Sequence, residues 1–392
     1  MATEQSNDEH PTDGAGGAPA ATGAAPAPLL GAASSEGGAG VLSLVDLEER
    51  ARGLLTPAAY GYYAGGAETE TTLREAPAAW GSWRLRPRVL RGVTALEPGS
   101  RGLGTTLLGS DVRTPIGVAP WAYQGMAHPD GELGTAAGAA AAGALMTVST
   151  SANHSQAAVA AVQPGSPKWF QLYRLHSPAY TDDLARRAAQ AGYRALVLTV
   201  DLPVLGRRLR DVGADTSAHA HLRMANHPPV HGPAPGLAAI QSPSWTFDDV
   251  SRFADVSGLP VVVKGVLRGD DAALCVQAGA SAVWVSTHGG RQADPAVASA
   301  HALPEVVDAV GDDVEVYVDG GIRHGSDVAV ALALGATAVF VGRPTIWGLA
   351  TGGAAGVTAV LDGLTAELAS TLTLCGVSGV RSVPRDTVVR VR

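Results

Sequence analysis

The chain has 392 residues, 46% of them hydrophobic and 16% charged, which is enough for one large or two ordinary globular domains. With 36 acidic against 28 basic residues the formal net charge is −8, which argues against a basic surface for nucleic acid or anionic lipid. Partners are therefore expected among small molecules. Cys275 and Cys375 lie in apolar surroundings without metal-ligand spacing, so we predict buried thiols in a reducing compartment and no metal site.

Residues 1–40 differ in composition from the rest of the chain. They contain acidic residues but neither Lys nor Arg, among many Ala, Gly, Pro and Ser. Disorder is the expected state, and neither a secretory signal nor a transit peptide is indicated. No later stretch reaches eighteen apolar residues without a charge or a turn signal, so we expect no membrane span and a cytoplasmic protein.

A short apolar run followed by an Ala-rich segment recurs eight times from residue 115 onward. The runs are PIGVAP, ALMTVST, KWFQLY, ALVLTVD, PVVVKG, AVWVSTHGG, VEVYVDGG and AVFVGRP. Between them, segments such as GELGTAAGAAAAG and GSDVAVALALG begin with helix-capping or acidic residues and end at Gly, as helices do. Eight buried strands alternating with helices predict an α/β fold, a (β/α)8 TIM barrel over residues 115–386.

Two segments fall outside this repeat. Residues 41–114 precede the barrel and are predicted to form an N-terminal helical segment that closes one end of it. Residues 209–243 form a long insertion after the fourth strand, on the face where barrel active sites form, so a mobile lid is expected there. The insertion contains His219, His221, His227 and His231 at irregular spacing, which favours a solvated loop over a metal site.

Polar residues at the carboxyl ends of the predicted strands are the candidates for chemistry, because the loops there build the site of a barrel. In chain order they are Gln171, Tyr173, Thr199, Asp201, Lys264, Ser286, His288, Asp319 and Arg343.

His288 precedes two glycines and Arg291, a pattern that suits a general base beside an anion-binding group. Asp201 could orient this histidine, or it could cap the next helix. Lys264 is one of only two lysines in the chain, which favours a fixed cation beside an electron acceptor over a lysine that extends to solvent.

Two further stretches carry arginines or glycines that suit anions. GRRLRD from Gly206 is either a solvated face or the source of one guanidinium that grips a substrate carboxylate together with Arg291. DGGIRHGSD from Asp319 and GRP from Gly342 form either plain turns or the phosphate site that the last two barrel loops often provide.

A set of motifs in this chain resembles one enzyme family. The motifs are YYAGGAE from Tyr62, RPRVLRGV, AHPDGE, WFQLY, TVDLPVLGRRLRD, KGV, STHGGRQ, DGGIRHGSD and VGRP. Together they resemble the FMN-dependent 2-hydroxy acid oxidase and dehydrogenase family, which includes glycolate, lactate and hydroxymandelate oxidases. The resemblance runs from about residue 44 to residue 386.

The resemblance assigns roles to individual residues. His288 would be the active-site base, paired with Asp201, while Lys264 would lie against the flavin and stabilise its reduced form. Tyr62, Arg208, Arg291 and Tyr173 would bind the substrate. The residues implied for the cofactor are Pro120, Trp121, Ala122, Ser149, Gln171, Thr199, Lys264 and Ser286, and for its ribityl phosphate Asp319, Gly321, Arg323, Gly342 and Arg343.

The reaction implied is the two-electron oxidation of an (S)-2-hydroxy acid to a 2-oxo acid, by hydride transfer or through a carbanion-like state. As the final electron acceptor we favour oxygen, which is reduced to hydrogen peroxide, over a quinone or cytochrome. The resemblance also implies a homotetramer. GRRLRD, WFQLY and AYQ look closest to hydroxymandelate oxidases, which favours an aromatic substrate such as mandelate or 4-hydroxymandelate. Tyr62 is retained as in glycolate and lactate oxidases, so small aliphatic acids stay open. Thr287 and Trp121 depart from the usual pattern of the family.

Two other functions are compatible with a barrel of this kind. A phosphate-binding lyase or isomerase would bind no flavin, and the purified protein would be colourless. A flavin-binding protein without activity would be yellow, but no hydroxy acid would bleach it.

Overall fold

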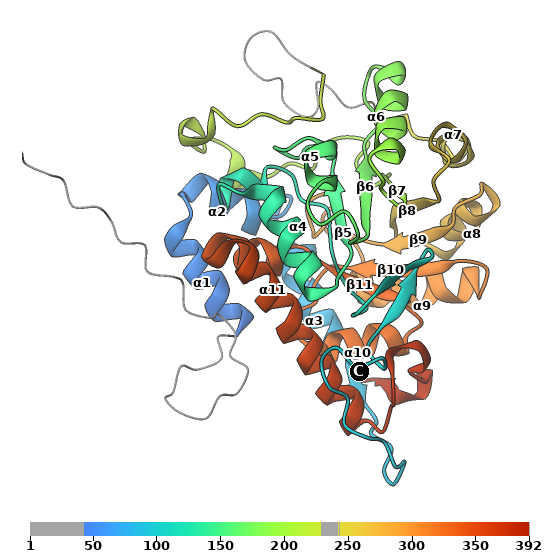
Figure 1. Ribbon diagram of the computed structural model, residues 1–392. Coiled ribbons are helices and arrows are strands. Elements are labelled where there is room, and N and C mark those ends of the chain that lie inside the picture. The colour runs from blue at the N-terminus through green and yellow to red at the C-terminus, as the bar shows by residue number, and fades with distance from the viewer. Residues whose placement is uncertain (1–42, 229–241, 243, 392) are drawn as a thin grey trace, which may run out of the picture.

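The computed structural model describes residues 43–228, 242 and 244–391. Eight parallel strands close into a barrel in the order β10-β11-β4-β5-β6-β7-β8-β9 (Figure 1). Their bounds are β4 Ile116–Val118, β5 Met146–Ser149, β6 Lys168–Leu172, β7 Leu196–Thr199, β8 Val261–Val266, β9 Ala282–Val285, β10 Glu315–Asp319 and β11 Ala338–Val341. Each coincides with one of the eight apolar runs, so the predicted TIM barrel is confirmed.

Helices surround the barrel and follow the strands (Figure 1). They are α4 Gly131–Ala142, α5 Gln156–Ala160, α6 Pro178–Gln190, α7 Asp248–Ser257, α8 Gly269–Gln277, α9 Ser299–Val310, α10 Gly325–Ala333 and α11 Arg343–Leu374. The predicted signals act as expected: Ser177 caps α6 with Pro178 in its first turn, and Gly143 ends α4 with a φ of +68°.

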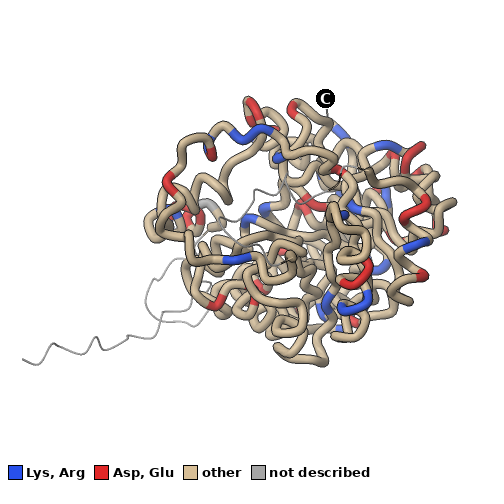
Figure 2. The backbone as a smooth tube through the Cα atoms, turned by 90° about the horizontal axis from the view of Figure 1, so that it is seen from above, with Lys and Arg blue, Asp and Glu red and all other residues tan. Residues whose placement is uncertain are grey.

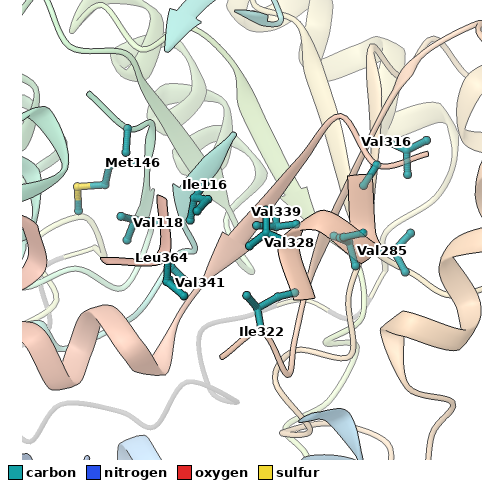
Figure 3. Close-up of a cluster of buried hydrophobic side chains, with 14 of the residues drawn as sticks. Ile116, Val118, Met146, Val285, Val316, Ile322, Val328, Val339, Val341 and Leu364 are labelled. Carbon is teal, nitrogen blue, oxygen red and sulfur yellow. The ribbon is translucent and has the colours of Figure 1, made fainter. Parts of the chain in front are cut away.

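The core has two layers, one outside the strands and one inside the barrel. Outside, apolar side chains of the strands pack against the helices, as Val118 and Val341 do near Leu364 of α11 (Figure 3). Inside, large aromatic side chains fill the barrel, and the rings of Trp284 and Phe340 lie 4.0 Å apart between centroids. A filled interior leaves only the ends of the barrel for a site.

The segment before the barrel is not purely helical, contrary to the prediction. It contains α1 Leu44–Leu54, α2 Pro57–Ala64 and α3 Thr71–Trp80, but also the short strands β1 Trp83–Leu85, β2 Thr105–Leu107 and β3 Ser110–Val112. The β2–β3 hairpin closes the amino end of the barrel, where Leu107 and Val112 pack against its interior residues and the Leu108 N–H donates to Glu315. The helix α2 instead reaches the carboxyl end through Tyr62.

The domain also extends beyond the predicted boundary at residue 386. Strand β12, Val388–Arg390, pairs with β1 in an antiparallel sheet, which ties the two ends of the domain together. The sequence did not predict this strand, because its three residues are too few to show the period-2 pattern of a strand.

Helix α11 is long and apolar enough to cross a membrane by length and composition alone, so the expectation that no such segment exists is corrected to that extent. Gly352 and Gly353 interrupt its helical geometry, and it packs against α4, α1 and α10. These contacts are those of a core helix in a folded domain.

Acidic and basic positions are interspersed around the molecule (Figure 2).

Candidate active site

A cavity opens at the carboxyl ends of the barrel strands, where the sequence placed the site. It is lined by most of the predicted residues: Tyr62, Pro120, Trp121, Ala122, Ser149, Tyr173, Thr199, Arg208, Lys264, His288, Arg291, Asp319, Gly321, Arg323, Gly342 and Arg343. Three further predicted residues lie behind this lining and form hydrogen bonds with residues in it: Asp201, Gln171 and Ser286. The sequence therefore located both the face and most of the residues of the site.

His288 and Asp201 form the first functional pair. Nδ1 of His288 lies 2.9 Å from Oδ1 of Asp201. With the Nδ1 proton shared with the carboxylate, Nε2 is left as the basic nitrogen. Burial lowers the pKa of His288 although Asp201 raises it, whereas the pKa of Asp201 is lowered by His288 and Lys264 against the effect of its own burial. The pair is thus a neutral imidazole backed by a carboxylate, the form that a general base requires.

His288 is held in place by its backbone as well. Its φ is +55°, a left-handed conformation that is uncommon for residues other than Gly. Its N–H donates to Oγ of Ser286 at 3.0 Å. Backbone strain at a half-buried histidine, supported by its neighbours, is typical of a functional position.

Lys264 belongs to a buried network with Ser286 and Asp319. Its Nζ donates to Oγ of Ser286 at 2.7 Å and lies 3.1 Å from Oδ2 of Asp319, while Ser286 donates to Oδ1 of Asp319 at 2.7 Å. The three residues lie on neighbouring strands or strand ends of the barrel. A buried lysine with one carboxylate partner is a fixed cation, and it does not extend into solvent.

Arg291 is placed to bind an anion in the cavity. Its Nη1 donates to the carbonyl oxygens of Tyr62 and Gly65, and its Nη2 is buried without a hydrogen-bond partner. Burial and the nearby Arg208 lower the pKa of Arg291 to about 10. Nε of Arg208 is also buried without a partner. Two close guanidinium groups with unused donors suit a carboxylate, which would remove both the repulsion and the unsatisfied N–H groups.

Tyr173 lines the same cavity, and its phenol has a raised pKa because of burial and the nearby Asp201. The phenol therefore stays protonated and can donate a hydrogen bond to an oxygen in the cavity.

Residues in the cavity lining and directly behind it leave buried polar atoms without partners. Oε1 of Gln171 accepts from Oγ of Ser149 and from the Thr150 N–H at 3.3 and 3.2 Å, but Nε2 of Gln171 has no partner. Oγ1 of Thr199 is likewise buried without one. Because unsatisfied buried polar groups are costly, these atoms indicate a polar ligand.

The last two strands contribute glycines and arginines to the cavity, as the phosphate-site prediction requires. Gly321 has a φ of +81°. Desolvation lowers the pKa of the half-buried Arg323, and it lowers the pKa of the buried Arg343 to about 9. Arg343 donates to the carbonyls of Tyr63, Gly65 and Gly289, which fixes its guanidinium. These groups and the backbone suit a phosphate, whereas Asp319, included in that prediction, has Lys264 and Ser286 as its partners.

A family model described as FMN-dependent dehydrogenase matches residues 51–390. The chain belongs to the FMN-dependent dehydrogenase family. An L-lactate oxidase of Nostoc sp. is 44% identical over 356 residues, which are 87% of this chain and 96% of that protein. Human 2-hydroxyacid oxidase 1 is 40% identical over 361 residues, 89% of this chain and 96% of that protein.

Solved structures agree with this membership. A mandelate oxidase superposes with a TM-score of 0.80 at 39% identity, covering 88% of this chain and 97% of that one. A Pediococcus acidilactici protein described as a lactate oxidase gives 0.82 at 36% identity, with 91% and 97% covered. The predictions of the family, of FMN as the cofactor and of an FMN-dependent enzyme of the 2-hydroxy acid oxidase type are confirmed.

The cavity of this FMN-dependent dehydrogenase family member fits the parts of FMN. The unused Nε2 of Gln171 and Oγ1 of Thr199 suit the polar edge of the flavin ring, and Lys264 supplies a positive charge for its reduced form. The cavity lining also contains Arg323, the buried Arg343 and the glycine backbone at Gly321, which suit the phosphate. When bound, FMN supplies a two-electron acceptor.

Some lining residues were not predicted from the sequence. Ser151, Leu202, Gly289, Ile322 and Pro344 each lie within a few residues of a predicted one. Their signal was only this proximity, because nothing in their residue type points to a ligand.

Residues 209–228 of the long insertion form hydrogen bonds with the rest of the domain. Oγ1 of Thr56 lies 2.9 Å from Nε2 of His219, and Oγ of Ser151 lies 3.0 Å from Nε2 of His227. The described residues contain no group of three or more side chains that could hold a metal ion, and His231 lies outside them. The mobile lid therefore stays a prediction.

Proposed function

We propose that this protein oxidises an (S)-2-hydroxy acid to the 2-oxo acid, with FMN as the first acceptor and oxygen, reduced to hydrogen peroxide, as the second. The observation that carries the proposal is the meeting of a base and an anion site in one cavity. Nε2 of His288 is free to accept a proton, and Arg291 and Arg208 in the same lining keep unused buried donors. A 2-hydroxy acid presents a hydroxyl proton and a carboxylate on adjacent carbons, which is the pair of groups these residues would bind.

The chain's own residues would act as follows. Arg291 and Arg208 hold the carboxylate and orient the substrate, and Tyr173 donates a hydrogen bond to the substrate oxygen. Nε2 of His288 takes the hydroxyl proton, and Asp201 stabilises the imidazolium that forms. Lys264, paired with Asp319, offsets negative charge that develops on the acceptor side.

An aromatic substrate such as mandelate or 4-hydroxymandelate is our first candidate. The cavity wall contains the rings of Tyr62, Trp121 and Tyr173, the apolar Leu202 and the small Ser151. Aromatic side chains pack well against an aromatic ligand. The structural similarity to mandelate oxidase supports this candidate. The similarity to an L-lactate oxidase supports the alternative, a small aliphatic acid.

The test is an anaerobic visible spectrum of the purified protein during titration with (S)-mandelate, (S)-lactate and the (R)-enantiomers. Bleaching by (S)-mandelate at lower concentration than by (S)-lactate supports the aromatic assignment, and the reverse assigns the aliphatic class. No bleaching by any of the four contradicts the proposed function. Admission of air then tests the acceptor: rapid return of the yellow colour with hydrogen peroxide supports an oxidase, and slow return favours a quinone-linked dehydrogenase.

A homotetramer and a cytoplasmic location complete the proposal, and both come from the sequence expectations. Light scattering of the full chain tests the first, and fractionation of source cells tests the second.

A further inference from the structure

Trp121 lies at the carboxyl end of β4, and its side chain reaches across to the end of β11. A Cβ atom on Gly342 would lie 2.5 Å from Nε1 of Trp121, so the indole packs directly on the Gly342 backbone. Its ring is edge-on to Tyr63, with centroids 5.5 Å apart, and to Tyr62, with centroids 6.3 Å apart. These contacts fix the plane of the indole within the cavity.

The indole faces the guanidinium that we assign to the substrate carboxylate. Cζ of Arg291 lies 5.1 Å from the Trp121 ring centroid and 4.8 Å from that of Tyr62. Arg291 thus contacts two aromatic rings while Nη1 bonds to two carbonyl oxygens, and the buried Nη2, which has no partner, is left for a ligand. Cζ of Arg343 lies 5.8 Å from the same Trp121 ring.

Arg291 needs such support because its surroundings disfavour a charge. It is buried, and Arg208 adds repulsion. An aromatic face stabilises a desolvated guanidinium through its negative quadrupole, and a rigid face also limits the rotation of the group.

We propose that Trp121 is a positioning residue that holds Arg291 in the orientation that presents Nη2 to a carboxylate. The role of Arg291 in this proposal rests on the proposed function, but the contact between Trp121 and Arg291 does not. Trp121 therefore controls the affinity for the carboxylate group of the substrate more than the rate of the chemical step.

The test compares Trp121→Leu and Trp121→Phe with the wild-type holoenzyme. Phenylacetate and acetate are the probes, because they carry the carboxylate but no oxidisable hydroxyl, and their binding is followed through the flavin spectrum. We expect Trp121→Leu to raise both dissociation constants on the order of tenfold, and Trp121→Phe, which keeps an aromatic face, to restore most of the affinity. In turnover, KM should rise while kcat changes less than threefold.

Trp83 provides the matched control. Cζ of Arg390 lies 6.0 Å from its ring centroid in the β1–β12 sheet, outside the residues that line the cavity. Trp83→Leu removes a similar arginine contact and should leave both dissociation constants unchanged. A second variant, Gly342→Ala, displaces the indole without removing it and should also weaken phenylacetate binding.

Three outcomes would overturn the proposal. One is an unchanged phenylacetate affinity in Trp121→Leu, and another is equal weakening in Trp83→Leu. The third is tighter FMN binding by Trp121→Leu, measured by flavin fluorescence, since the indole would then occupy space that the cofactor needs. If no 2-hydroxy acid bleaches the wild type but phenylacetate affinity still depends on Trp121, the proposed function fails and this inference stands. If a 2-hydroxy acid bleaches the wild type but the phenylacetate affinity is independent of Trp121, the proposed function stands and this inference fails.

Discussion

Nδ1 of His288 lies 2.9 Å from Oδ1 of Asp201, while Oδ2 of Asp201 is buried without a partner. The two residues are 87 positions apart in the sequence, at the ends of different strands. Asp201 therefore has one strong interaction, and its charge acts mainly on the imidazole. Removing that charge should change the chemistry of His288 more than the stability of the fold.

Asp201→Asn is expected to slow flavin reduction by the best 2-hydroxy acid. The amide keeps the shape of the side chain but loses the negative charge that stabilises the imidazolium. Because a positioned base contributes about a hundredfold to ten-thousandfold, we expect a loss within that range. The measurement is the anaerobic rate of flavin bleaching by stopped flow. A rate within threefold of the wild type, in a variant that retains FMN, would show that Asp201 does not assist the base.

The pH dependence of kcat/KM should report the neutral form of His288. Burial lowers the pKa of this histidine below its usual value of 6.5. The active neutral imidazole is lost as the pH falls through the lowered pKa, so kcat/KM should decline only below pH 6.5. A pH profile from peroxide release checks this, and an acid limb with its midpoint above 6.5 would contradict it. In Asp201→Asn the limb should move to lower pH, because the neighbour that favours the charged imidazole is gone.

Gly321→Ala should destabilise the phosphate end of the cavity. The φ of Gly321 is +81°, and a Cβ atom there would lie 2.2 Å from the Ala76 carbonyl oxygen of α3. Gly258, with a φ of +67° and no atom within 4 Å of its Cβ position, is the matched control. We expect Gly258→Ala to cost roughly 1–2 kcal/mol from backbone strain alone, and Gly321→Ala about 1–3 kcal/mol more from the clash.

Thermal unfolding and the FMN content of the two glycine variants are the measurements. Only Gly321→Ala should lose cofactor, since only its loop lies at the cavity. Equal losses of stability in both variants would mean that the contact with α3 relaxes without cost.

His227 should make stability depend on pH. Burial lowers its pKa from 6.5 to about 4 while Nε2 stays bonded to Ser151. The unfolded chain therefore binds the proton more readily, so the free energy of unfolding falls as the pH falls from 6.5 toward 4. Between pH 7.5 and pH 5 we expect His227 to account for about 2 kcal/mol of that loss.

Denaturant unfolding of the wild type and of His227→Gln at both pH values measures the difference. The glutamine cannot be protonated, so its stability should fall less. His221→Gln, at an exposed position of the same insertion, is the control. A pH dependence in His227→Gln equal to that of the wild type would exclude His227 as the source.

The order of residue types along the chain was enough to predict the barrel and most of the cavity. The eight buried strands appear in the sequence as continuous apolar runs. In a parallel barrel the carboxyl ends of all strands lie at one face, so polar residues at those ends, such as Lys264 and His288, line the same cavity. The sequence motifs identified FMN as the cofactor, because their residue types and order are specific to the FMN-dependent family. Local signals were sufficient wherever the fold repeats a unit.

The pairing of residues from different loops depends on the folded chain. The short hairpin that closes the amino end of the barrel has too few residues for a period-2 pattern. Its place depends on packing into one apolar cluster with residues far along the chain, such as Trp169 and Phe340. The partners of Asp319 and the ring that faces Arg291 also depend on distances between strand ends, which spacing in the sequence does not encode. Side-chain contacts across the barrel mouth follow from how the strands close, so Trp121 acquires its place beside Arg291 only in the folded chain.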